Sequence, residues 1–207
     1  MASKRCKQCK TKHTGDDVLK MKSTPSNLGL FCDFNCIADW VKDNPVKVKS
    51  NYKKAVTREK REFNDNDVGN QLKLTQTVFN KMRVLEEKLW FKLRGLEPEC
   101  ISCGKTNMDW CCGHFKTVGS QGALRFDKMN TYLQCNRYCN MGKSGNINGD
   151  KTTRGYIKGL HDRFGEDRAK SIIEYCETDR IAKWDAQELQ ELRRNLSVEV
   201  RKLESML

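Results

Sequence analysis

The sequence has no apolar run long enough to cross a lipid bilayer, so we expect a protein that does not enter membranes. Its first ten residues, MASKRCKQCK, also lack the hydrophobic stretch of a secretory signal peptide. Together these absences predict a soluble protein that acts in the cytoplasm. They also argue against a disulfide framework, because disulfides are rare in that compartment.

Apolar residues in general are scarce. They make up 37% of the 207 residues, against 32% for charged residues. This is a lean supply for one large hydrophobic core, so we expect one or two compact domains with small units stabilised by metal. Histidine is rarer still, with three in the chain, so few imidazole groups are available for chemistry.

Positive charge, by contrast, is in excess. The chain has 39 Lys and Arg against 27 Asp and Glu, which gives a formal net charge of +12. Basic proteins bind polyanions, because neutralising phosphates releases condensed counterions. We therefore expect a nucleic acid as the partner, although the same charge would also serve solubility alone.

Cysteine is abundant, with eleven in the chain, and the odd number argues against a complete disulfide set. A C-x2-C pair followed by a C-x3-C pair occurs twice, and four thiolates suffice for a closed tetrahedral zinc site. The sequence therefore predicts two structural Zn²⁺ ions and leaves Cys111, Cys112 and Cys176 unassigned. The predicted ligands are Cys6, Cys9, Cys32 and Cys36 for the first ion, and Cys100, Cys103, Cys135 and Cys139 for the second.

These patterns predict a mainly helical chain in three parts. Residues 1–43 form an N-terminal zinc unit, with a loop over 23–29 and a short helix after Cys36. Residues 44–73 form a basic linker or helix, because residues 42–62 carry eight Lys or Arg against three acids. We expect Lys53 and Lys54 there to contact DNA, although an ordinary solvated linker fits the charge equally well. Residues 74–207 form the third part.

Helical periodicity is clear in the third part. Apolar residues recur at three- and four-residue steps over 74–96, which predicts an amphipathic helix. A second helix is expected over 156–175, interrupted near Gly165. Asp185 and Glu188 predict the capped start of a last helix that runs to about Glu204. This last helix is expected either to pack on the helix over 74–96 or to build a dimer.

Cys100–Asn146 is the segment with the richest chemistry. Strand-like stretches over 109–115 and 131–134, followed by a short helix, give a ββα order that one zinc ion would clamp at both ends. Within it, His114 suits activation of a water molecule, and a hard cation such as Mg²⁺ or Mn²⁺ prefers oxygen ligands. Asn140 offers one such oxygen, and Asp109 or Asp127 could supply another. Phosphates would be held nearby by Lys116, Arg125, Arg137 and Lys143.

Simpler roles are open for the same residues. A histidine in a cysteine-rich unit is often a spare zinc ligand. Asn130, which could orient His114, is also typical of a turn, and Asn140 is typical of a helix cap. The order of the motifs favours catalysis: C-x2-C, then Gly-His, then Asn, then C-x3-C-N-x2-K-x-G-N.

That order resembles the HNH nuclease superfamily, in an H-N-N variant. The motifs CISCG, GHF, LRF, MN, QC-x3-CN and KSGN are similar to the NinG (Rap) recombination endonucleases of lambdoid phages, and the similarity extends over most of the chain. The resemblance implies a ββα (treble-clef-like) zinc unit and a structure-selective nuclease for Holliday junctions and D-loops. By position, it makes His114 the general base, Asn130 the central residue and Asn140 a ligand of the catalytic metal.

One position departs from that pattern. Many HNH enzymes carry an aspartate just before the histidine, where this chain has Gly113. A non-catalytic two-zinc module that binds DNA or regulates is therefore the alternative, and an RNA-binding zinc protein is a third reading. Symmetric cutting of a four-way junction needs two active sites, so the enzyme reading also predicts a homodimer.

Overall fold

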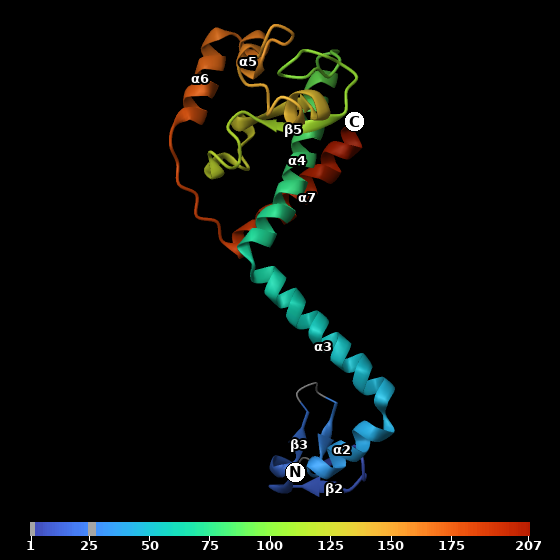
Figure 1. Ribbon diagram of the computed structural model, residues 1–207. Helices are drawn as coiled ribbons and strands as arrows, with labels where there is room; N and C mark the ends of the chain where they lie inside the picture. The colour runs from blue at the N-terminus through green and yellow to red at the C-terminus, as the bar shows by residue number, and fades with distance from the viewer. Residues whose placement is uncertain (1–2, 25–27) are drawn as a thin grey trace. The chain divides into compact units, whose positions relative to one another are not determined.

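The computed structural model describes residues 3–24 and 28–207, which divide into two compact units, Met1–Asn64 and Asp65–Leu207 (Figure 1). The parts expected from the sequence were bounded at residues 43 and 73, on either side of this division. Of the loop expected over 23–29, residues 25–27 lie outside the described part. No helix in the described ranges is both long and apolar enough to span a bilayer.

The first unit is built from short elements around a small core. Two antiparallel strand pairs, β1 (Ser3–Arg5) with β2 (Lys12–Thr14) and β3 (Lys22–Ser23) with β4 (Leu30–Phe31), flank α1 (Asp17–Lys20). Helix α2 (Phe34–Asp43) begins where the Asp33 carboxylate accepts a hydrogen bond from the Cys36 N–H at 2.8 Å. The core is small because it holds few apolar side chains, namely Met21, Leu28, Phe31 and Trp40 beside Cys6.

The basic segment is a helix. Helix α3 (Pro45–Asn66) has 22 residues and no fully buried side chain, and Val48 near its start packs partly against the core of the first unit. The break expected over 64–70 is short. Helix α4 (Val68–Lys92) starts after Asp67, whose carboxylate accepts from the Asn70 N–H at 2.7 Å. This cap explains why α4 begins before residue 74, where the apolar stripe starts.

Helix α4 and the last helix, α7 (Ala186–Met206), lie side by side in the second unit (Figure 1). The expected cap of α7 is confirmed, because Asp185 accepts from the Gln187 N–H at 2.7 Å and from the Glu188 N–H at 3.3 Å. The expected packing of these two helices on each other is confirmed as well, because the apolar stripe of α4 contacts α7 of the same chain. The buried residues between them are Phe79, Met82, Leu89, Leu196, Val200 and Leu203.

A strand pair lies between this helix pair and a second helical layer. Strand β5 (Trp110–His114) pairs antiparallel with β6 (Thr131–Cys135), and the short helix η3 (Asn136–Met141), a wide π-type turn, follows directly. Side chains alternate between the faces, with Cys112 toward α4 and α7 and Tyr132 toward the other layer. That layer contains α5 (Tyr156–Phe164) and α6 (Glu166–Glu177), and the break expected at Gly165 is confirmed.

Buried charges join β6 to the helices on either side. Glu87 of α4 accepts from the Leu133 N–H at 3.1 Å and pairs with Arg83 at 3.2 Å and with Arg163 of α5 at 2.7 Å. Arg83 in turn donates to the Thr131 carbonyl and hydroxyl. The network provides hydrogen-bond partners for the Leu133 N–H and the Thr131 carbonyl of β6. Each buried charge is paired with an opposite charge, so none is isolated.

Truncating this network should destabilise the second unit. Glu87→Ala leaves two buried guanidinium groups without their shared carboxylate, so we expect a loss of about 3–5 kcal/mol in the free energy of unfolding. Urea unfolding of the zinc-loaded chain, followed by tryptophan fluorescence, measures it. Glu204→Ala is the control, because it removes an exposed 2.7 Å ion pair between α7 and Lys81 and should cost about 1 kcal/mol or less. Equal losses in the two variants would contradict a special role for Glu87.

Candidate metal centres and candidate active site

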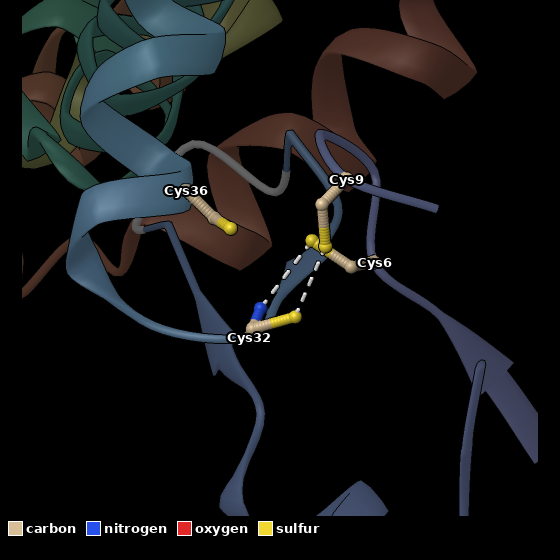
Figure 2. Close-up of side chains that lie close together, drawn as sticks. All are labelled: Cys6, Cys9, Cys32 and Cys36. Carbon is tan, nitrogen blue, oxygen red and sulfur yellow. Dashed lines mark hydrogen bonds between the residues drawn. The ribbon is translucent and has the colours of Figure 1, made fainter. Parts of the chain in front are cut away.

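Four cysteines of the first unit point their sulfur atoms toward one another (Figure 2). Cys6 and Cys9 lie in the turn between β1 and β2, Cys32 follows β4, and Cys36 lies in the first turn of α2. All four Sγ atoms lie within 4.8 Å of one another, and those of Cys9 and Cys32 are 3.4 Å apart. The Cys32 N–H donates to the Cys6 sulfur at 3.4 Å, which favours a thiolate at Cys6.

The second unit has a matching cluster. Cys100 and Cys103 lie in the turn before β5, Cys135 ends β6, and Cys139 lies in η3. Here too the four Sγ atoms lie within 4.8 Å of one another. Backbone N–H groups again donate to sulfur, from Cys135 to Cys100 at 3.3 Å and from Cys139 to Cys135 at 3.4 Å. The Asn146 side chain adds a longer contact to the Cys139 sulfur, at 3.6 Å.

Both clusters fit a zinc ion. Tetrahedral thiolates at the usual zinc–sulfur distance lie about 3.8 Å apart, close to the 3.8 Å between the sulfur atoms of Cys103 and Cys135. None of the eleven cysteines forms a disulfide. Burial, together with the nearby thiols of Cys103 and Cys135, raises the pKa of Cys100 to about 12. A bound dication would offset both effects and allow the thiolate to form.

The second cluster positions a pocket at the far end of β5. This pocket has a volume of about 300 Å³. The structure thus brings together two of the residues singled out from the sequence, His114 at the end of β5 and Asn140 directly after Cys139. The pocket also contains residues to which the sequence assigned no role, and two of these, Ser144 and Gly145, belong to the KSGN motif. The lining residues are His114, Thr117, Val118, Asn140, Ser144 and Gly145.

The His114 ring is fixed by a backbone carbonyl. Its Nε2 lies 3.1 Å from the Arg125 oxygen, and a carbonyl oxygen can only accept, so Nε2 carries the proton of the neutral ring. Nδ1 is then left as the proton acceptor. Burial lowers the pKa of His114 more than the Arg125 and Cys112 carbonyls raise it. The imidazole is therefore neutral at neutral pH, which is the form that a general base needs.

Asn130 has a different place. It is fully buried, and its side chain accepts from the Lys116 N–H at 2.7 Å and donates to the carbonyls of Lys116 and Leu124. These bonds close the loop between β5 and β6. Asn130 does not line the pocket, and its contacts are to the backbone of this loop and not to the His114 ring.

Asp109 is not brought to the pocket. It is exposed just before β5, and its carboxylate accepts from the Asn136 side chain at 3.3 Å. His114 lies five positions further along an extended chain, which places it roughly 16 Å away. Its expected role as a ligand beside His114 and Asn140 therefore has no geometric support.

Gly113 is explained by a neighbour on β6. A Cβ atom at Gly113 would lie 2.5 Å from Oε1 and 2.7 Å from Cβ of Gln134. Gln134 is fully buried, and its Nε2 donates to the Ser102 hydroxyl and the Gly145 carbonyl, each at 2.6 Å. The space in which an acidic side chain would begin is thus filled by a buried amide. The sequence showed the glycine but not its cause.

The basic residues expected to hold DNA are spread out. Lys53 and Lys54 are exposed on α3, and Arg137 is exposed on η3. Three others already have partners within the chain. Lys116 pairs with Glu177 at 3.4 Å, Lys143 pairs with Asp150, and the Arg125 guanidinium donates to Gln76 at 3.4 Å.

Fold and clusters together define a mainly helical protein with two four-cysteine sites that could hold zinc. A model of the family described as Bacteriophage Lambda NinG protein matches residues 1–205, and the chain belongs to this NinG family of bacteriophage proteins. Protein NinG of Escherichia phage 933W is 44% identical over 55 residues, which are 26% of this chain and 27% of that protein. The corresponding figures for NinG of Salmonella phage P22 are 44%, 26% and 27%, and for NinG of Escherichia phage lambda 42%, 26% and 26%.

The stretch matched to these curated relatives is about a quarter of this chain and about a quarter of each relative. The family model, by contrast, matches residues 1–205 of this chain. No solved structure matches the chain. What the protein does must therefore be inferred from the local geometry of its sites.

Metal analysis tests the two clusters separately. Protein purified without chelator should contain about two zinc ions per chain, because each set of four thiolates fills one tetrahedral site. Replacing Cys6 and Cys9 together by Ser should lower this to about one and leave the second unit folded. Cys111→Ser is the control, because Cys111 lies outside both clusters and donates to a backbone carbonyl, which a serine can also do. Wild-type protein with no zinc would contradict the assignment.

Proposed function

We propose that the chain is a structure-selective DNA endonuclease with an HNH-type ββα centre, which cuts branched DNA such as Holliday junctions and D-loops during phage recombination in the host cytoplasm. The observation that carries this proposal is the shared pocket of His114 and Asn140. These residues come from β5 and from η3, which follow the strand–strand–helix order of that centre. Membership of the NinG family supports it.

Hydrolysis would begin at His114. Nδ1 takes a proton from a water molecule, the water oxygen forms a bond to phosphorus, and the bond from phosphorus to the 3′ oxygen breaks. The leaving oxygen takes a proton from solvent, which gives a 5′-phosphate and a 3′-hydroxyl. Arg125 holds the ring in place through its carbonyl, and Asn130 closes the loop that carries Arg125. The Asn140 amide contacts the phosphate from the opposite wall.

The donors present do not by themselves make a site for the expected Mg²⁺ or Mn²⁺. Protein sites for Mg²⁺ use one or two carboxylates, and no aspartate or glutamate lines this pocket. Of the predicted ligands of the catalytic metal, Asn140 lines the pocket and Asp109 does not. The proposed hydrolysis therefore rests on the protein's own residues. Cleavage assays with and without Mg²⁺ and Mn²⁺ decide whether a metal ion is needed.

Most contacts to the DNA backbone would come from helix α3, which lies outside the pocket. Helix α3 presents Lys53, Lys54 and further basic residues to solvent along 22 residues, as a helix lying along a phosphate backbone would. A homodimer would supply the two active sites for symmetric junction cutting. A strictly monomeric mass in sedimentation, both with and without junction DNA, would count against the dimer.

A non-catalytic two-zinc DNA-binding module is the second candidate. It is favoured by the same absence of a carboxylate in the pocket and by the buried Gln134 beside Gly113. An RNA-binding protein, the third reading, would prefer RNA in competition binding. Cleavage and binding must therefore be measured separately.

Removing the base should abolish cutting but not binding. His114→Ala should slow cleavage of labelled four-way junctions and D-loops in Mg²⁺ or Mn²⁺ by about 10²- to 10⁴-fold, the usual contribution of a general base. His161→Ala is the matched control, because His161 lies outside the pocket and pairs with Glu166. If neither wild type nor His114→Ala cuts and both bind equally, the enzyme reading is wrong.

The salt dependence of binding tests α3. Replacing Lys53 and Lys54 together by Ala should weaken binding to junctions and duplex alike. It should also reduce the slope of log K against log salt by about 0.9 for each phosphate that the variant no longer neutralises. Replacing Lys158 and Lys170, which pair with acids of the second unit, serves as the control with equal charge change. An unchanged slope would exclude α3 from the DNA interface.

A further inference from the structure

One wall of the His114 pocket has an unusual backbone. Three consecutive residues have positive φ angles, +47° at Ser144, +86° at Gly145 and +49° at Asn146. Residues other than glycine rarely adopt this left-handed conformation, because their Cβ atom comes too close to the following carbonyl oxygen. Two non-glycine residues in such a turn persist only if their surroundings hold them there.

Buried polar groups hold this turn. The Gly145 N–H donates to the Cys139 carbonyl at 3.0 Å, and the Gly145 oxygen accepts from the buried Gln134 amide at 2.6 Å. The Asn146 side chain donates to the Thr153 hydroxyl at 2.9 Å and contacts the Cys139 sulfur. These anchors come from β6, from η3 and from Thr153, and they leave Ser144 exposed on the pocket wall.

The pocket offers groups suited to an anion. Ser144 and Thr117 provide hydroxyls, Asn140 an amide and His114 an imidazole, and no carboxylate lines the pocket. The Thr117 hydroxyl donates to the Ser120 oxygen at 3.0 Å. Within residues 3–24 and 28–207, by contrast, neither the Ser144 hydroxyl nor the Asn140 side chain has a hydrogen-bond partner. Hydroxyl and amide groups are common contacts to phosphate oxygens, whereas a dication would need a carboxylate.

We propose that Ser144 is a phosphate-binding residue of the pocket, and that the left-handed turn 144–146 exists to present its hydroxyl, with the Asn140 amide, opposite His114. This inference deepens the proposed function, because the bound group would be the phosphate that is cut. It explains why a strained turn lies beside His114, and why Gln134, which anchors Gly145, fills the space next to Gly113. Ser144 orients the phosphate and takes no proton.

Titration with inorganic phosphate tests the site without requiring cleavage. Amide NMR of the zinc-loaded full chain should show shifts at His114, Asn140 and Ser144 that saturate together. Mg²⁺ alone should leave these signals in place. Ser144→Gly should weaken phosphate binding at least roughly tenfold, the usual effect of losing one hydrogen bond to a charged group. Glycine accepts the positive φ, so this variant keeps the turn.

Asn107→Gly is the matched control. Asn107 is exposed, has a φ of +53° and lies outside the pocket, so its replacement relieves the same kind of strain without removing a pocket group. It should bind phosphate as wild type does. The proposal is overturned if phosphate shifts none of the pocket amides, if Mg²⁺ alone shifts them instead, or if Ser144→Gly binds phosphate with unchanged affinity. If the protein binds phosphate in the pocket but cuts no DNA, the phosphate site is supported and the proposed nuclease function is wrong.

Discussion

The convergence of Cys100, Cys103, Cys135 and Cys139 is the constraint on which the second unit depends. It ties together a turn before β5, the end of β6 and the helix η3, and 31 residues of the chain lie between Cys103 and Cys135. Because Cys139 is fixed, Asn140 is placed next to it, and the turn over 144–146 is bonded to the backbone of the same helix. A zinc ion at this point would hold the pocket in shape where few apolar side chains are available to do so.

The sheet next to this cluster is only two strands wide, so its stability comes from what covers it. Apolar layers pack on both faces, and Glu87 satisfies a backbone N–H on the outer edge of β6 through a buried ion network. Polar groups are also buried on the pocket side, where Gln134 links β6 to the turn at Gly145. The same amide excludes any side chain at Gly113.

Binding and chemistry are assigned to different parts of the chain. The basic helix α3 has no fully buried side chain, and Val48 near its start packs partly against the core of the first unit, whereas the pocket with His114 lies in the second unit. The two proposals can therefore fail independently. Replacing the lysines of α3 would change the affinity for DNA and its salt dependence. Replacing His114 would change the cleavage rate, and replacing Ser144 would change the binding of one phosphate in the pocket.

The sequence alone determined the two cysteine clusters, the strands β5 and β6 and the start of α7, because these depend on residue spacing or on a local cap such as Asp185. It also indicated His114 and Asn140, whose places next to a strand end and a zinc ligand are local properties. Only the tertiary structure decided that Asp109 lies at the far end of β5, that Asn130 closes a loop, and that Ser144 lines the pocket. These depend on how distant segments pack. The reason for Gly113 was invisible in the sequence, because the side chain that excludes a Cβ there comes from Gln134, on the other strand.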